Sequence, residues 1–152
     1  GINDSEINDF IELADQYDLL IRFIELMPIG HLSFDWESHY LSSDEVVKNY
    51  PLVLDSAGKN TVYYKVEGKK GRIGFINPIS HKFCGDCNRI RLTSDGKIKP
   101  CLHTDEEINV RGLSLEEVKS EIRRSIKEKP SSHKINEDDY EEITRTMNRI
   151  GG

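Results

Sequence analysis

Cysteine is scarce in this sequence, with three residues among 152. An odd number this small cannot build the disulfide framework of small secreted domains, which predicts a reducing compartment, with the cytoplasm as the default. No apolar run approaches the roughly 18 residues needed to span a bilayer, and the first residues show no basic stretch followed by an apolar one. These absences argue against a membrane-spanning protein and against a secreted one.

A surplus of basic residues is also missing. Lysine and arginine number 21 against 27 aspartates and glutamates, which gives a formal net charge of −6. Proteins that hold nucleic acid or anionic lipid through broad electrostatic attraction have the opposite balance. We therefore expect neither a nucleic-acid nor a membrane partner, although this composition still permits a local basic pocket.

The first thirty residues predict one helix followed by one strand. Asn3 and Glu6 have the spacing of a helix-capping pair, and apolar residues from Ile7 onward recur at helical spacing. Residues 19–27 are almost continuously apolar, which is typical of a strand covered on both faces, as in parallel sheets. Because one helix and one strand cannot complete such a sheet, we expect the last α/β unit of an assembly whose earlier units are missing from this chain.

Two further helices are predicted by their capping residues. Residues 31–40 have no clear period and are expected to form a loop. Ser42 with Glu45, and Ser114 with Glu117, have the spacing of capping boxes, and each helix that they open should end before a proline.

The remaining regular structure is predicted to be antiparallel. Residues 61–67 and 72–76 carry the β-branched and aromatic content of strands and flank a turn, which predicts a β-hairpin. An Asp-Gly pair at residues 95–96 predicts a second hairpin between residues 90–93 and 97–99. The predicted fold class is therefore α+β.

All three cysteines fall within eighteen residues, as Cys84, Cys87 and Cys101. A C-x2-C step lets two thiolates converge on one metal, and the second hairpin can return Cys101 beside them. Either His103 or His81 could complete a structural Cys3His zinc site. Alternatively, three thiolates could hold a 4Fe-4S cluster with one iron open to a substrate atom. A thioredoxin-like redox pair is the weaker third reading, because the C-x2-C does not open a helix after a strand.

Two arginines lie close to this motif, at positions 89 and 91. Residues two apart on a strand share a face, so Arg89 and Arg91 should point the same way. They could merely balance the charge of the thiolates, but a guanidinium pair also matches the geometry of phosphate oxygens. Beside a cluster with an open iron, this pair predicts a pocket for a phosphorylated, nitrogen-rich substrate such as a nucleotide.

The motif FCGDCNRIRLTSDGK at residues 83–97, with Cys101 and Leu102 after it, resembles the C-terminal cluster motif of the GTP 3′,8-cyclases. These are radical S-adenosylmethionine enzymes that begin molybdenum cofactor synthesis. RFIELMPIG at residues 22–30 is similar to a late barrel strand of that family, and MNRIGG at residues 147–152 resembles its double-glycine terminus. The whole chain is compatible with the C-terminal half of the family.

The resemblance implies that the chain binds GTP through a second 4Fe-4S cluster, whose open iron meets the guanine ring. The ligands of this cluster would be Cys84, Cys87 and Cys101. The residues that would line the GTP site are Arg89, Ile90 and Arg91.

The resemblance also implies a cofactor contact and a functional tail. Met27 would touch S-adenosylmethionine, although a core residue at the end of a strand is the other interpretation of this position. Gly151 and Gly152 would form a tail that reaches into the active site, where glycine can pass closely along other backbone, although such a chain end can also simply be frayed.

The resemblance is incomplete at one point, because the C-x3-C-x2-C motif of the radical-generating cluster belongs to the N-terminal half of the family. We therefore expect the end of a TIM-type barrel at residues 1–34, a connecting helix and hairpin at 35–80, and a cluster and GTP-binding region with the tail at 81–152. The missing N-terminal half would be a partner, the full-length enzyme would be a homodimer, and this chain alone would be inactive.

Overall fold

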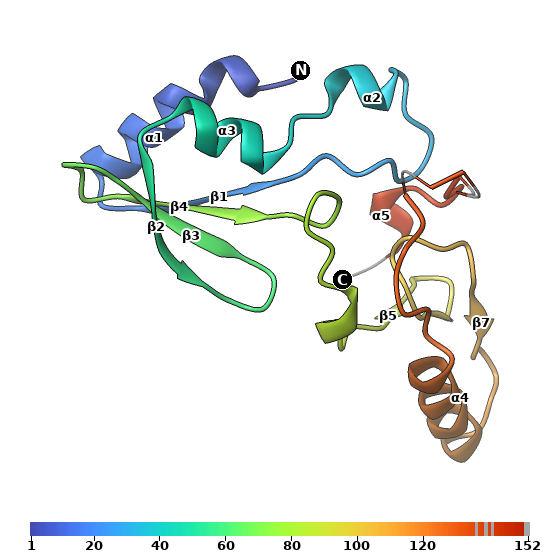
Figure 1. Cartoon of the computed structure of the whole chain (residues 1–152). Helices are drawn as coiled ribbons and strands as arrows, with labels where there is room; N and C mark the ends of the chain where they lie inside the picture. Colours follow the sequence, from blue (N-terminus) through green and yellow to red (C-terminus); the bar gives the residue numbers. More distant parts are fainter. Residues whose placement is uncertain (136, 139, 141, 151–152) are drawn as a thin grey trace. The chain divides into compact units, whose positions relative to one another are not determined.

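The computed structural model describes residues 1–135, 137–138, 140 and 142–150 (Figure 1). It contains helices and two separate sheets, so the predicted α+β class is confirmed. The chain divides into two compact units. Unit 1 comprises Gly1–Met27 and Phe34–Phe83, and unit 2 comprises Pro28–Ser33 and Cys84–Gly152.

Unit 1 is built on a four-stranded sheet in the order β1-β4-β3-β2. Its strands are β1 (Leu20–Ile24), β2 (Leu52–Ala57), β3 (Val62–Val66) and β4 (Arg72–Ile76). Strand β1 pairs in parallel with β4, and the other pairs are antiparallel, which confirms the predicted β3–β4 hairpin. Strand β2 was not predicted. A register shift between Leu54 and Ser56 interrupts its pairing, so the strand lacks the alternation that would reveal it.

The predicted strand at residues 19–27 is shorter in the structure and is not covered on both faces. Ile24, at the end of β1, exposes 58% of its surface, and β1 is an edge strand of the sheet. The next residue, Glu25, is buried, and its carboxylate accepts hydrogen bonds from the segment after β4 and from Ser43, the first residue of the helix Ser43–Asn49. A carboxylate that is taken out of water needs such partners, which explains its place in an otherwise apolar run.

The helices of unit 1 are α1 (Ile7–Gln16), preceded by the 3-10 turn η1 (Asp4–Glu6), α2 (Trp36–His39) and α3 (Ser43–Asn49). Helix α1 buries Ile7, Ile11 and Ala14 against Ile73 and Phe75 of β4, which forms the core of this unit. This packing follows the helical spacing that predicted α1.

Of the two helix starts predicted in unit 1, one is wrong and one is confirmed, and a helix lies within the predicted loop. The Asn3 side chain makes no cap hydrogen bond, because the 3-10 turn η1 lies where the capping box was expected. The predicted loop at residues 31–40 contains α2, which begins where Asp35 accepts a hydrogen bond from the Ser38 N–H. The capping box of Ser42 and Glu45 at the start of α3 is present.

Unit 2 contains a small antiparallel sheet in the order β5-β6-β7. Its elements are the 3-10 turn η2 (Cys84–Asp86), β5 (Arg91–Leu92), β6 (Lys97–Lys99), β7 (Ile108–Asn109), α4 (Leu115–Lys127) and α5 (Met147–Ile150). The turn between β5 and β6 holds Gly96 at a φ of 79°, which confirms the Asp-Gly hairpin. The capping box of Ser114 and Glu117 at the start of α4 is also present. Strand β7 was not predicted, because two residues are too few to show alternation.

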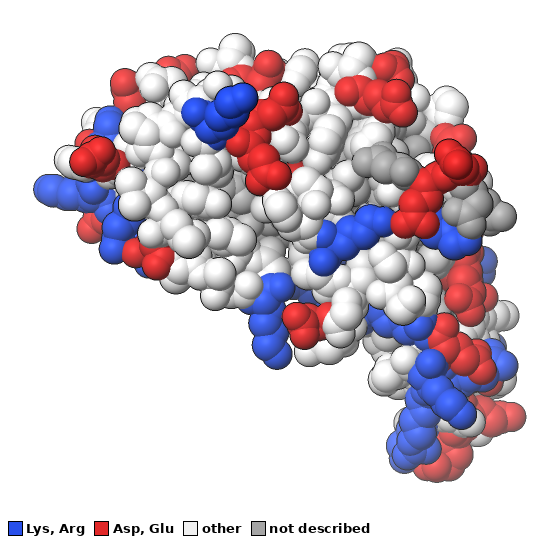
Figure 2. Space-filling model, viewed as in Figure 1, with Lys and Arg blue, Asp and Glu red and all other residues white. Residues whose placement is uncertain are grey.

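Two expectations from the composition concern membrane-spanning helices and basic surface patches. No helix within the described ranges has the length and apolar content that crossing a membrane requires. Figure 2 shows acidic and basic side chains intermixed over α4 on the face in view, so the visible side of this helix carries no purely basic patch. Helix α4 carries both acidic residues in its first turn and basic residues in its last turn.

Candidate functional site

The three cysteines of unit 2 are free and half-buried. Cys84 opens η2, Cys87 follows this turn, and Cys101 lies two residues after β6. The backbone N–H of Cys87 donates to the carbonyl of Cys84 at 3.0 Å, which closes the C-x2-C step into a tight turn. The hairpin β5–β6 returns the chain toward this turn: burial chiefly raises the pKa of the Cys101 thiol, and charge on Cys84 and Cys87 adds to this effect.

Lys129, which follows α4, holds the C-x2-C turn. Its ammonium donates to the Cys87 sulfur at 3.0 Å, to the Cys87 carbonyl at 3.2 Å and to the Arg89 carbonyl at 2.7 Å. Burial alone would raise the pKa of the Cys87 thiol, but the hydrogen bonds from the Arg89 N–H and from Lys129, with the charges of both residues, outweigh it and lower this pKa. Cys87 is therefore more inclined to ionise than Cys101.

Cys101 has the opposite environment. Burial raises the pKa of its thiol, and the N–H of His103 donates to its sulfur at 3.4 Å. The His103 ring packs against the His133 ring, with 4.5 Å between centroids, and burial lowers the pKa of His103 to about 3. His103 is therefore a neutral ring at neutral pH, packed on a second imidazole.

The two arginines lie beside these thiols. Arg89 is exposed and precedes β5, whereas Arg91 is half-buried at the start of that strand, so only Arg91 of the pair is part of a strand. Burial and the charge of Arg89 lower the pKa of Arg91, while Cys87 and Cys101 act in the other direction. No described carboxylate pairs with either guanidinium. A guanidinium presents a planar fork of N–H donors, the geometry that the oxygens of an anion such as phosphate require.

The thiols are not arranged as a finished ligand set. Among residues 1–135, 137–138, 140 and 142–150, no three His, Cys, Asp or Glu side chains are close enough together to hold a metal ion. The other zinc-ligand candidate, His81, lies in unit 1, where its Nε2 is 2.9 Å from an Asp44 carboxylate oxygen. The three-cysteine metal centre therefore stays a proposal.

The remaining predicted site residues are placed as follows. Ile90 is half-buried between the two arginines, and Met27 is half-buried at the end of the first segment of unit 1. Gly151 and Gly152 lie outside the described residues.

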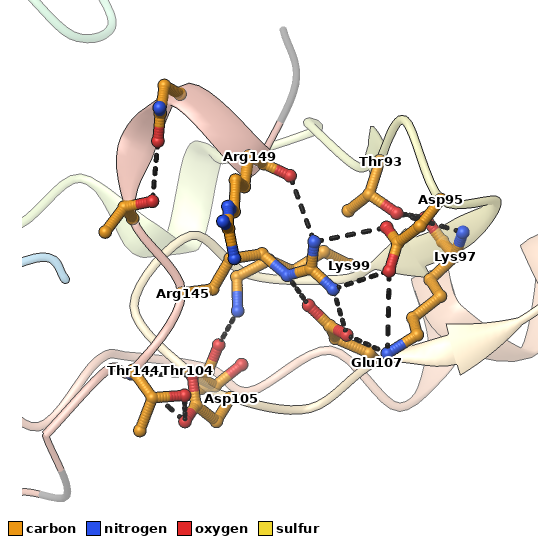
Figure 3. Close-up of polar contacts among 12 residues, drawn as sticks. Thr93, Asp95, Lys97, Lys99, Thr104, Asp105, Glu107, Thr144, Arg145 and Arg149 are labelled. Atoms are coloured by element: carbon orange, nitrogen blue, oxygen red, sulfur yellow. Dashed lines mark hydrogen bonds and ion pairs between the residues drawn. The ribbon is translucent and has the colours of Figure 1, made fainter.

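Sequence reasoning missed two residues that organise unit 2. Lys129 contacts a residue 42 positions away, and Arg145 pairs with carboxylates 38 and 50 positions away. Neither has a local pattern that reveals its partner. Figure 3 shows the Arg145 group, which joins the β5–β6 turn to the C-terminal segment.

The class that the fold and the site define is an α+β protein with three free cysteines that lie beside two arginines and a lysine. The family model described as Molybdenum Cofactor Synthesis C matches residues 19–135, and the chain belongs to this family.

Curated relatives extend the likeness over the whole chain. It is 44% identical to the GTP 3′,8-cyclase of Alkaliphilus oremlandii, 43% identical to that of Syntrophomonas wolfei and 40% identical to that of Clostridium botulinum strain Okra. Each comparison covers 100% of this chain and 49% to 50% of the relative. The chain thus spans about half the length of the curated relatives it matches.

Proposed function

We propose that this chain is the part of a GTP 3′,8-cyclase that binds GTP beside a second 4Fe-4S cluster. The reaction would convert GTP to (8S)-3′,8-cyclo-7,8-dihydroguanosine 5′-triphosphate during molybdenum cofactor synthesis. Family membership and the names of the curated relatives support this proposal. The observation that carries it is the position of Arg89 and of the half-buried Arg91 beside the thiols, where no carboxylate of the described part of the chain pairs with either guanidinium.

The donor chemistry of unit 2 suits a thiolate-bound cluster. Its ligands would be Cys84, Cys87 and Cys101, all of them free. Lys129 and Arg91 would offset the negative charge of the thiolates, and Lys129 would orient the Cys87 sulfur through its hydrogen bond. The chemistry that such a cluster supplies is an open coordination position on one iron for an atom of the guanine ring.

The arginines would hold the phosphate end of GTP. Each guanidinium presents a planar fork of N–H donors that matches phosphate oxygens. Arg91 is half-buried, so a phosphate bound there would be attracted more strongly than at an exposed residue. Ile90, between the two, would form part of the wall of the site.

The proposal also includes parts that this chain would not supply by itself. A radical S-adenosylmethionine half with its own cluster would precede the chain, and Met27 would contact S-adenosylmethionine. The edge strand β1, with its parallel neighbour β4 and its exposed Ile24, supports a barrel that continues beyond this edge. The predicted division at residues 1–34, 35–80 and 81–152, the homodimer, the cytoplasmic location and the inactivity of this chain alone belong to the same proposal.

Metal analysis tests the cluster. Chain purified and reconstituted without oxygen should contain iron and acid-labile sulfide, and replacing any one of the three cysteines with Ala should reduce both. Zinc without sulfide would contradict the proposal and favour a Cys3His zinc site. In that case, His103→Ala and His81→Ala would identify the fourth ligand by loss of metal.

GTP binding tests the arginine pair. In the full-length enzyme, Arg91→Gln should weaken GTP binding by about 10- to 150-fold, the equivalent of about 1.5–3 kcal/mol for a charge-assisted hydrogen bond, with cluster content unchanged. Isothermal titration measures the affinity. Arg123→Gln, which removes an exposed arginine from α4, is the matched control and should bind GTP normally. Normal GTP binding by Arg91→Gln would contradict the assignment.

A further inference from the structure

The backbone of Lys129 is restricted on both sides. Helix α4 ends at Lys127, and the backbone N–H of its C-cap Glu128 donates to the Arg124 carbonyl at 2.9 Å. Pro130 follows Lys129 directly, and a proline disfavours helical backbone at the residue before it. Lys129 therefore leaves the end of a helix with little backbone freedom, so its side chain starts from a defined point.

The ammonium of Lys129 uses all of its N–H groups within unit 2. It donates to the Cys87 sulfur at 3.0 Å, to the Cys87 carbonyl at 3.2 Å and to the Arg89 carbonyl at 2.7 Å. Because an ammonium has three N–H donors, these three acceptors saturate it. Two of the acceptors are backbone carbonyls, so the position of the charge does not depend on the chemical state of the sulfur.

The charge of Lys129 is directed at the thiols. No carboxylate within residues 1–135, 137–138, 140 and 142–150 pairs with this ammonium, so no acidic neighbour cancels its charge there. Burial acts to raise the pKa of both Cys87 and Cys101, and the charge of Lys129 acts in the opposite direction at each thiol. One cation thus acts on two of the three sulfurs, and it touches one of them.

We infer that Lys129 is a positioning residue that raises the reduction potential of the second cluster by holding a charged N–H donor on the Cys87 sulfur. The inference rests on the proposed function, because it concerns the cluster proposed there. One-electron reduction adds a negative charge to a thiolate-bound cluster, and hydrogen bonds to the sulfurs and nearby positive charge stabilise this more negative state. Lys129 has no N–H group left for the phosphates of GTP, so it acts through Cys87 and not on the substrate.

A redox titration tests this role. The chain has three cysteines in all, so any cluster that it holds after reconstitution without oxygen is this one. Dithionite supplies the electrons, and the EPR signal of the reduced, loaded fraction gives the midpoint potential. In Lys129→Met, the ratio of reduced to oxidised cluster at a given potential should fall by about tenfold, a downward shift of about 59 mV for one electron.

Two further variants separate the charge beside Cys87 from other effects. Lys127→Met removes an equal charge from an exposed position of α4, so it is the matched control and should keep the wild-type midpoint. Lys129→Arg retains a positive charge with N–H donors, and its ratio of reduced to oxidised cluster should stay within about threefold of wild type.

The direction of the shift distinguishes a lost charge from a loosened turn. An opened C-x2-C turn would admit water, which stabilises the more negative reduced state and raises the midpoint. An unchanged or raised midpoint in Lys129→Met would therefore overturn the inference. It would also be overturned if Lys129→Met held no cluster while Lys127→Met held one, because the ammonium would then retain the cluster instead of setting its potential.

Failure of the inference is distinguishable from failure of the proposed function. A wild-type chain that takes up neither iron nor sulfide would overturn the proposed function and this inference with it. A loaded wild-type chain whose midpoint is the same as that of Lys129→Met would overturn the inference alone.

Discussion

Glu25 offers a direct test of how unit 1 is held together. The residue exposes 6% of its surface. One oxygen accepts from the Ile79 N–H at 2.9 Å and the Ser80 N–H at 3.0 Å. The other accepts from the Tyr40 hydroxyl at 3.0 Å, from the Ser80 hydroxyl and from the Ser43 N–H at 3.4 Å. The side chain therefore joins the end of β1 to two segments that are distant in sequence.

Two substitutions separate the contributions of charge and acceptor. Glu25→Gln can keep its amide oxygen toward the two N–H groups and turn its NH₂ toward the hydroxyls of Tyr40 and Ser80, which can rotate to accept. The loss is then mainly the charge assistance, together with the long 3.4 Å hydrogen bond of the Ser43 N–H, which would face the NH₂ without an acceptor, about 1–2 kcal/mol in all. Glu25→Ala leaves the N–H groups of Ile79 and Ser80 buried without an acceptor, at about 1–3 kcal/mol each, so we expect a loss of about 4 kcal/mol.

Urea unfolding followed by circular dichroism measures both values, since the free energy of unfolding falls linearly with urea concentration. Glu67→Gln, at an exposed position of unit 1, is the control and should change stability by less than about 0.5 kcal/mol. Equal losses for Gln and Ala at position 25 would refute the reasoning, because they would show that the backbone donors do not depend on an acceptor there.

Two further predictions concern unit 2. Lys129→Met should destabilise the chain by about 1–2 kcal/mol in urea unfolding, because three hydrogen bonds to the C-x2-C turn are lost, and it should lower the iron retained after reconstitution. Lys127→Met, at an exposed position, is the matched control. Equal stability and equal iron content in the two variants would contradict the role of Lys129. The second prediction concerns pH. Hydrogen bonds from Arg145 lower the pKa of Asp95, and those from Arg145 and Lys97 outweigh burial and lower the pKa of Glu107. Both carboxyls are thus more acidic in the folded chain, so their contribution is complete above the unfolded values of about 4 and is lost as pH falls through the lower folded values. The difference in urea midpoint between wild type and Arg145→Gln should therefore stay constant above about pH 5 and shrink as pH falls below about 4, and a constant difference down to about pH 3 would contradict this linkage.

Local signals in the sequence predicted local structure well. The capping boxes at Ser42 and Ser114 and the Asp-Gly turn were predicted because each depends on residues within four positions of one another. Strand β2 and helix α2 were missed, since a register shift hides the alternation of the strand and a single turn is too short to show a helical period.

The site could be predicted only in part. The cysteine spacing and the neighbouring arginines are sequence patterns, so the residues could be named before the structure was known. Lys129, Arg145 and Glu25 could not, because their partners lie 42, 50 and 54 positions away along the chain and only the fold brings them together. A glutamate within the apolar run at residues 19–27 was the one available sign, since a carboxylate in such a run needs partners.

The chain enters unit 2 at Pro28–Ser33, returns to unit 1 and enters unit 2 again at Cys84. The Tyr140 hydroxyl accordingly donates to the Pro28 carbonyl across 112 positions of sequence. During synthesis on the ribosome, unit 2 cannot close until Tyr140 has emerged, so contacts of long sequence separation should make this unit slow to fold. A cut between residues 83 and 84 would also separate Pro28–Ser33 from the rest of unit 2. Two separately expressed domains can therefore not be obtained by dividing the sequence at one point.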